Sequence, residues 1–166
     1  MAGFMQLDGT GLVGDSKNVM FQGYIRIDSM SSEITREIAE SARGLQRAKG
    51  HTILNNISVS RQLDKSSTQL QKFVAAGTVI TKAKICFANM YGATNQYQTY
   101  LQYELENVIL ASYSISCDSE GEDLPKEELT LAYTKVTWTF NGFDETGKPV
   151  DTGIAAHYDL TTDVAG

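Results

Sequence analysis

Few residues in this chain have the types and spacing that catalysis or metal binding requires. The two histidines, His51 and His157, lie far apart, and no HxxH, HExxH or His-x-His spacing begins a metal site. The two cysteines, Cys86 and Cys117, form no CxxC pair and neither lies near a histidine. We therefore expect no metal, free and mostly buried thiols, and one surface and one partly buried histidine.

A glycine-rich stretch, GTGLVG from Gly9 to Gly14, matches the GxGxxG pattern of dinucleotide-binding loops. Asp28 follows about 20 residues after the first glycine, where a ribose-binding acid is found. Such a site needs a helix that begins inside the motif, so that its N-terminal amides meet the pyrophosphate. The following DSKNVMFQGYIRI has no helical period. We interpret the stretch as an ordinary loop and keep a small nucleotide-dependent enzyme as a third hypothesis.

Neighbouring carboxylates can perform acid-base catalysis, and this chain has three such pairs: Glu104/Glu106, Glu122/Asp123 and Glu127/Glu128. The first pair falls on the polar face of a predicted strand, and the other two fall in or beside an acidic loop. No GxSxG motif of a serine hydrolase is present. We interpret the pairs as solvated charges and predict neither an enzyme nor a cofactor.

Length and composition are those of one globular domain, residues 1–166, with a loose tail expected at 161–166. The 20 acidic and 14 basic residues give a net charge of −6, and the basic residues form no concentrated stripe, which argues against nucleic-acid binding. No apolar run approaches the length of a membrane span, and MAGFMQLDGTG lacks the features of a cleavable signal peptide.

Most of the chain has the alternating pattern of β-strands. The longest run, from Tyr97 to Ser116, places apolar residues at odd positions such as Leu105 and Ile109, which predicts one buried and one wet face. Asn107 interrupts this run, so we expect a bend or bulge there.

The apolar phase changes once more near the C-terminal end. Leu131 and Tyr133 keep one phase and Val136 and Trp138 the other, which predicts a β-bulge near Thr134 and Lys135.

One segment, LDKSSTQLQKFVAAG, has the pattern of an amphipathic helix. Leu70, Phe73 and Val74 fall at i, i+3 and i+4, and Gly77 suits the left-handed position after the last turn. At the other end, Asp64 or Ser66 can accept a hydrogen bond from a free backbone amide. A helix this short is marginal in water, so its apolar stripe must pack on a sheet.

The segment SSEITREIAESARGLQRAKGH permits two interpretations. The i,i+4 spacing of Glu33/Glu37 and Ile34/Ile38 suits a helix. Gly44 and Gly50 break the second half of that pattern, and residues 39–51 would equally suit a long solvated loop.

Three segments in order resemble the haemolysin-coregulated protein family, the tube subunit of the bacterial type VI secretion machine: SVSRQLDKSSTQLQKFVAAGTVI, YLQYELENVILASYSIS and LPKEELTLAYTKVTWTF. FMQLDGTGLVGDS is similar to the family's first strand and loop, so the resemblance covers about residues 3 to 160. It implies a mainly β fold, with two packed antiparallel sheets forming a barrel-like β-sandwich and one flanking α-helix at about residues 65–76. It also favours a strand within 33–38 and an extended loop over 39–51.

The same resemblance implies a structural subunit that forms hexameric rings, which stack into a hollow tube. The implied partners are a tip spike, a contractile sheath and secreted effector proteins carried in the lumen, without nucleic acid or membrane insertion. The implied location is the bacterial cytoplasm during assembly, then the extracellular space or target cell. The alternatives are a monomeric β-sandwich binding module and a structural protein like that of a phage tail tube.

The charged loop from residue 39 to 51 replaces a glycine-rich loop of the family. In the family this loop reaches toward other subunits or rings, so we expect its basic residues to meet an acidic surface of another copy. The candidate contact residues are Arg43, Arg47 and Lys49 on one side and Glu120, Glu122 and Asp123 on the other.

Overall fold

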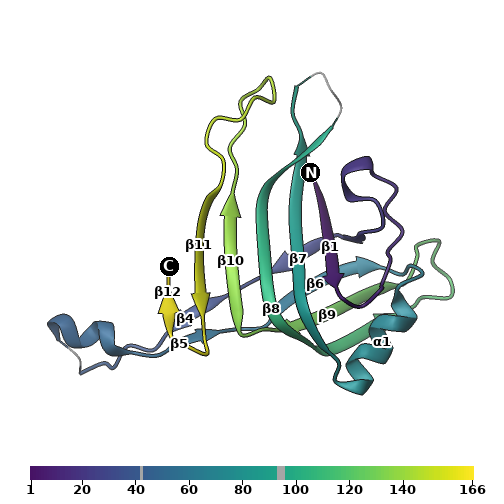
Figure 1. The fold of residues 1–166 in the computed structure, drawn as a ribbon. Coiled ribbons are helices and arrows are strands. Elements are labelled where there is room, and N and C mark those ends of the chain that lie inside the picture. The colour runs from purple at the N-terminus through teal and green to yellow at the C-terminus, as the bar shows by residue number, and fades with distance from the viewer. Residues whose placement is uncertain (42, 93–95) are drawn as a thin grey trace.

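Antiparallel β-strands make up most of the computed structural model, which describes residues 1–41, 43–92 and 96–166, without the side chains of residues 48 and 49 (Figure 1). Among these residues the strands are β1 (Ala2–Asp8), β2 (Ile25–Ile27), β3 (Ser29–Ser31), β4 (Ile34–Arg36), β5 (Thr52–Leu54), β6 (Ile57–Gln62), β7 (Val79–Met90), β8 (Tyr97–Ser116), β9 (Lys126–Ala132), β10 (Lys135–Phe140), β11 (Ile154–Asp159) and β12 (Val164–Ala165). The α-helix is α1 (Ser67–Ala76), and two 3-10 helices are η1 (Val19–Phe21) and η2 (Gly44–Lys49).

The described strands other than β4 and β5 form two layers that share β8, while β4 and β5 form a separate two-stranded sheet. The first layer has the order β12-β11-β10-β8-β7-β1-β2, and the second contains β3, β6 and β9, with β9 paired to β8. Figure 1 shows the long strands of the first layer crossing those of the second at a steep angle. The expected mainly β fold with two packed antiparallel sheets and one flanking helix is confirmed.

Asn107 marks the corner at which β8 passes from one layer to the other. The residues of β8 up to Glu106 pair with β10, and those from Ile109 onward pair with β9. Asn107 has a left-handed φ of 52°, and its Nδ2 donates to Thr134 Oγ1 at 3.2 Å. Asparagine is among the residues that tolerate this conformation best. The predicted bend is confirmed.

The expected buried face of β8 is wrong immediately after this corner, at residues 108–111. Val108 and Leu110 are buried, whereas Ile109 is 40% exposed and Ala111 is also exposed. The left-handed residue turns the strand, so Val108 and Leu110 face the core, and a register shift between Leu110 and Ser112 then returns Tyr113 to the core side.

The β-bulge predicted near Thr134 and Lys135 is also wrong. The chain instead ends β9 at Ala132 and begins β10 at Lys135, in the other layer. Thr134 N donates to Glu106 O at 3.2 Å, beside the corner of β8. The change of phase in the sequence is therefore a second crossing between layers.

The main core lies between the layers and beneath α1. It contains buried aliphatic residues from both layers, including Met5, Ile57, Leu105 and Leu131, and the helix contributes the fully buried Leu70. Phe73 and Val74 of α1 are partly buried and pack against this core. The amphipathic stripe predicted from the sequence is confirmed.

Both ends of α1 have the expected signals. Asp64 Oδ1 accepts from the backbone amide of Ser66 at 2.8 Å, while Ser66 itself makes no side-chain cap. Gly77 has φ 61°, and its amide donates to Val74 O at 3.2 Å. The left-handed conformation at Gly77 suits a residue without a Cβ atom.

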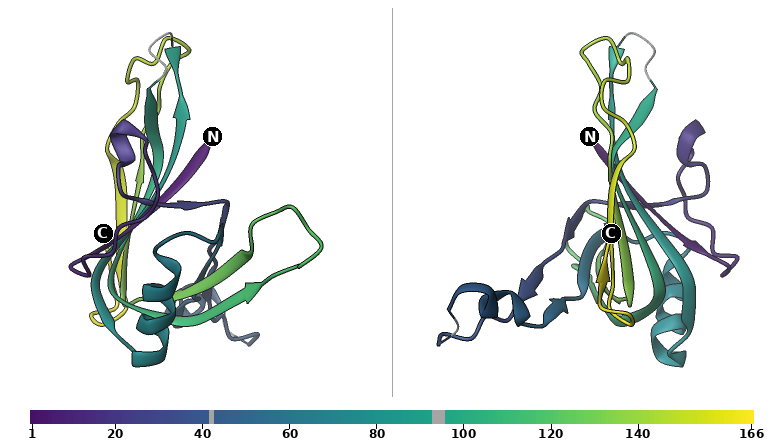
Figure 2. Two further views of the ribbon diagram at one scale, coloured as in Figure 1. Left: turned by 90° about the vertical axis from the view of Figure 1, so that its right-hand side faces the viewer. Right: turned by 60° about the vertical axis from the view of Figure 1, so that its left-hand side comes forward.

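Residues 33–41 and 43–54 form a projecting ribbon rather than an α-helix. β4 pairs with β5, η2 lies between them, and the ribbon extends away from the body (Figure 2). A Cβ atom at Gly50 would lie 1.5 Å from Glu37 O. The backbone segments at residues 37 and 50 therefore approach more closely than any residue other than glycine allows. The helical interpretation of residues 33–38 is wrong, and the strand that the family resemblance implies there is confirmed as β4. The described part of the loop expected over 39–51 contains the 3-10 helix η2.

A second, smaller cluster lies on the opposite face of the first layer. Phe21 of η1 stacks on Phe4 with ring centroids 4.1 Å apart, and the cluster also buries Cys86 and Ala88. The loop from Gly9 therefore leads to a 3-10 turn that covers the sheet, and the α-helix that a dinucleotide site requires does not follow it.

The C-terminal residues are not the loose tail we expected. Val164 pairs with Asp159 in an antiparallel ladder, and His157 and Gly166 exchange backbone hydrogen bonds of 2.6 and 3.0 Å. The short strand β12 thus covers part of the edge of the first layer.

Candidate assembly surfaces

The side chains that could do chemistry lie apart in the fold. His51 is exposed at the ribbon, and His157 is half-buried on β11. Cys86 is buried, and burial raises the pKa of its thiol to about 11, which leaves it protonated and unreactive near neutral pH. Cys117 is exposed, so the expectation of buried thiols is wrong for this residue.

Residues 1–41, 43–92 and 96–166 hold neither a metal-binding cluster nor a membrane-spanning helix. No group of three or more histidine, cysteine, aspartate or glutamate side chains could hold a metal ion there. None of the helices described is long and apolar enough to cross a membrane. The surfaces of the sheet and its loops are therefore the features with functional interest.

A row of alternating charges crosses five strands of the first layer. Each member lies directly opposite the next on the neighbouring strand, in the order Asp8, Lys82, Glu106, Lys135, Asp159. The adjacent row contains Lys84 and Glu104 on the same face. Residues opposite each other in antiparallel strands have neighbouring side chains, so each charge faces the opposite sign. We call this set of seven residues the charged face.

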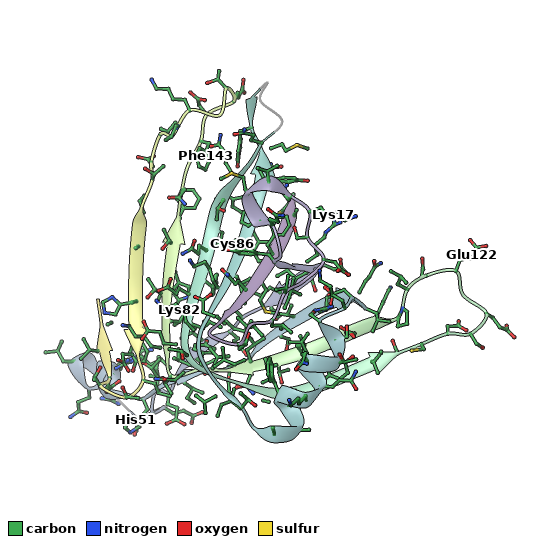
Figure 3. All side chains as sticks on the ribbon, turned by 45° about the vertical axis from the view of Figure 1, so that its right-hand side comes forward. Lys17, His51, Lys82, Cys86, Glu122 and Phe143 are labelled. Carbon is green, nitrogen blue, oxygen red and sulfur yellow. The ribbon has the colours of Figure 1, made fainter. Side chains whose placement is uncertain are left out.

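Two ion pairs join neighbouring strands within the charged face. Lys82 Nζ lies 2.9 Å from Glu104 Oε1, and Lys135 Nζ lies 3.3 Å from Glu106 Oε1. The four side chains keep between 26% and 36% of their surface exposed. The hydrogen bond and charge of Glu104 raise the pKa of Lys82, with smaller contributions from Glu106 and Asp8. Figure 3 shows Lys82 on the long strands, away from the loop that carries Glu122.

The outer face of the second layer has a different chemistry. One row across four strands consists of hydroxyl residues, in the order Ser31, Ser58, Thr130, Ser112. The hydroxyls of Ser112 and Thr130 lie 2.6 Å apart. The two outer faces of the sandwich therefore differ, one charged in alternating sign and the other composed largely of small hydroxyl side chains.

Both basic and apolar side chains of the projecting ribbon are exposed to solvent. Arg43 and Arg47 are exposed, and so is Leu45 at 90%. Ile38 is 52% exposed and Ile53 is 41% exposed. The side chain of Lys49 lies outside the described residues. Exposed apolar side chains on a projecting element are typical of an interaction surface.

The predicted acidic partners lie in the loop between β8 and β9. Glu120, Glu122 and Asp123 are all exposed there. Within one copy they do not meet the basic residues, because the ribbon and this loop lie at opposite sides of the molecule in Figure 1. Figure 3 likewise separates His51, at the ribbon, from Glu122. The structure thus places Arg43 and Arg47 in one group and Glu120, Glu122 and Asp123 in another, far from the first.

A buried polar network attaches α1 to the second layer. Arg61 on β6 and Glu127 on β9 are each 1% exposed, and Arg61 Nε lies 3.0 Å from Glu127 Oε2. The contact is an ion pair without a well-aligned hydrogen bond to that oxygen. Arg61 also donates to Ser66 Oγ at 2.9 Å and pairs with Asp64, immediately before the helix.

Tyr113 completes this network from β8. Its hydroxyl donates to Glu127 Oε1 at 2.5 Å and accepts from Gln71 Nε2 of α1 at 3.2 Å. Burial, followed by the hydrogen bond and charge of Glu127, raises the pKa of Tyr113 to about 12. The network therefore links β6, β8, β9 and α1 through one carboxylate.

Neither the network nor the charged face was predicted from the sequence, and the interpretation of Glu127 as a solvated charge is wrong, because its side chain is buried beside Arg61. A signal for the first existed, because Arg61 continues the buried alternation of Ile57 and Val59. For the second, the polar positions of β7 and β8 were visible, but their alignment depends on strand register.

Comparison with known proteins places the chain among type VI secretion proteins. The model of the family described as "Type VI secretion system effector, Hcp" matches residues 4–140. No curated protein matches the sequence.

Solved structures share the fold at low sequence identity. One described as a type six secretion system protein has a TM-score of 0.89 at 20% identity, covering 99% of both chains. Hcp1 from Salmonella typhimurium has a TM-score of 0.72 at 22% identity, covering 99% of this chain and 98% of that one. Hcp1 from E. coli EAEC 042 has a TM-score of 0.75 at 19% identity, covering 96% and 97%.

Proposed function

The chain belongs to the Hcp family of the type VI secretion system, and from that premise we propose that it forms hexameric rings that stack into a hollow inner tube. The family consists of secreted tube proteins rather than enzymes, and its solved members share this fold. The proposed assembly is made in the bacterial cytoplasm and then secreted. Its proposed partners are a tip spike, a contractile sheath and effector proteins carried in the lumen.

The observation that carries this proposal is the placement of the basic ribbon and the acidic loop on opposite sides of the subunit. A surface that binds its own complement on another copy makes a head-to-tail contact, and such contacts close into rings when the rotation between copies permits. Arg43 and Arg47 of one copy would then meet Glu120, Glu122 and Asp123 of the next. The ribbon's exposed Leu45 would lose its contact with water in the same step.

Hydrodynamic measurement and imaging test the proposal directly. Sedimentation velocity of the purified chain is expected to show a hexamer, and negative-stain images are expected to show rings with a central hole. A monomer at high protein concentration, with no rings in the images, would contradict the proposal and favour the alternative of a monomeric binding module.

A further inference from the structure

We propose that the charged face of the first layer forms the wall of the channel and that its alternating charges make this wall passable to solutes of either sign. This inference rests on the proposed tube assembly. It assigns the channel lining to particular residues of this chain and states how the wall treats charged molecules.

The charged face is poorly suited to burial between subunits. Its seven ionised side chains would have to leave water together, and each buried ion costs several kcal/mol that pairing does not reliably offset. Lys82, Glu104, Lys135 and Glu106 remain partly exposed in the subunit even where they form ion pairs. A surface of this kind is expected to stay in contact with water after assembly.

The parts of the subunit that reach out toward other copies belong to the other layer. The ribbon continues β3 and β6, and the acidic loop joins β8 to β9. The hydroxyl row beside them is uncharged and made of small side chains, and Ser112 and Thr130 are already hydrogen-bonded to each other, so burying this row against a neighbouring copy costs less than burying ionised side chains. The charged rows, by contrast, run across five strands and lie beyond the sheet region that the Phe21 cluster covers. This leaves the charged face for the channel.

The charges of this face nearly cancel. Three lysines stand against four carboxylates, a net of −1, whereas the whole chain carries −6. Opposite charges alternate at the spacing of neighbouring strands, about 5 Å, which is shorter than the Debye length of about 8 Å at physiological salt. The field of such a row decays close to the wall. A passing anion and a passing cation therefore meet similar, small barriers.

Cysteine labelling of assembled tubes tests where the face lies. Thr137→Cys places a thiol opposite Glu104 on the charged face, and Gln69→Cys places a control thiol on the exposed side of α1. Both are made with Cys117→Ser, while the buried Cys86 is retained. In tubes confirmed by sedimentation and microscopy, the thiol at position 137 should react with small maleimides but not with a large polyethylene-glycol maleimide. The thiol at position 69 should react with both.

Small maleimides of opposite charge test the passage of ions. Anionic and cationic reagents should label position 137 in tubes at rates within about twofold of each other. Adding Lys82→Gln and Lys135→Gln leaves Lys84 against four carboxylates, so the cationic reagent should then react about tenfold faster than the anionic one. Lys72→Gln with Lys148→Gln makes the same change of net charge on exposed lysines elsewhere and should leave the two rates alike. If the double variant does not assemble, Thr139→Asp adds a carboxylate to the face without removing an ion pair, and the same preference is expected.

Several results would overturn the inference while the tube itself remains established. Labelling of position 137 by the large reagent at the rate of position 69 would place the face outside, and complete protection from all reagents would place it between subunits. A strong sign preference in the unmodified wall, or an equal effect of the charged-face substitutions and the control substitutions on the two labelling rates, would contradict the charge argument. Absence of any ring would instead refute the proposed function, and the inference with it.

Discussion

Arg61 Nε lies 3.0 Å from Glu127 Oε2, and both side chains are fully buried between β6, β9 and α1. Removing one member of a buried ion pair leaves the other charge without compensation, at a cost of about 3–5 kcal/mol. We expect Glu127→Leu to lower the free energy of unfolding by about this amount, measured in urea. The double variant Arg61→Met with Glu127→Leu should cost less than the sum of the two single changes, because neither fully buried charge then lacks the other, although Asp64, with 12% of its side chain exposed, loses its pair with Arg61. A double variant that costs the sum of both single changes would contradict this explanation.

The environment of the Tyr113 hydroxyl leads to a second prediction, which concerns how the free energy of unfolding depends on pH. The pKa of Tyr113 is raised to about 12 from 10.0, so the folded state holds this proton more tightly than the unfolded state does. The resulting stabilisation is fully present below pH 10 and is lost as the pH rises toward about 12. Tyr113→Phe should cost about 1–3 kcal/mol at neutral pH, because Glu127 loses a donor. Between pH 9 and 12, the free energy of unfolding should fall less steeply with pH for Tyr113→Phe than for the parent chain. An equal slope for the two proteins would show that Tyr113 does not cause the loss of stability.

Asn107 provides a prediction about backbone conformation. With φ at 52°, this position disfavours β-branched residues, so Asn107→Val should cost about 1–3 kcal/mol. Asn107→Gly should be tolerated, because glycine adopts this conformation readily. Ser114→Val adds the same side chain at an exposed position later in β8 and should have little effect. Equal losses for both valine variants in thermal unfolding would argue against strain at the corner.

The packing of α1 predicts an order of stability losses. Leu70 is fully buried, so Leu70→Ala should cost about 2–5 kcal/mol. Phe73 is only partly buried, so Phe73→Ala should cost less than the about 3–5 kcal/mol typical of a buried phenylalanine. Gln69→Ala lies on the exposed side and should be nearly silent. Urea unfolding of the three variants checks this order. A larger loss in the free energy of unfolding for Gln69→Ala than for Leu70→Ala would contradict the orientation of the helix described above.

Charge reversal on the ribbon tests the proposed contact between copies. Arg43→Glu with Arg47→Glu should weaken assembly at moderate salt, because the reversed ribbon would repel the acidic loop of the next copy. Adding Glu120→Lys and Glu122→Lys should restore assembly in part. Lys17→Glu with Lys72→Glu makes the same change of net charge at exposed sites outside the ribbon. Sedimentation velocity measures the outcome, and unchanged assembly of the first variant would exclude these residues from the contact.

Local patterns predicted those parts of the fold that depend on a few consecutive residues. The caps and stripe of α1 and the bend at Asn107 follow from the preferences of glycine, aspartate and asparagine. The segment around Glu37 misled local reasoning because its i,i+4 spacing suits a helix, whereas pairing of Ile34 with Leu54 stabilises a ribbon. Tertiary pairing outweighed helix propensity, which is weak.

The sequence by itself determined that this protein is a β-rich chain with one capped helix, without the residue spacing of a catalytic or metal site. These properties are encoded over distances of a few residues, where periodicity and capping act. Only the tertiary structure decided that Asp8, Lys82, Glu106, Lys135 and Asp159 form one row, and that Arg61 meets Glu127 in the core. Strand register sets which distant residues become neighbours, and register follows from how the whole set of apolar faces packs together.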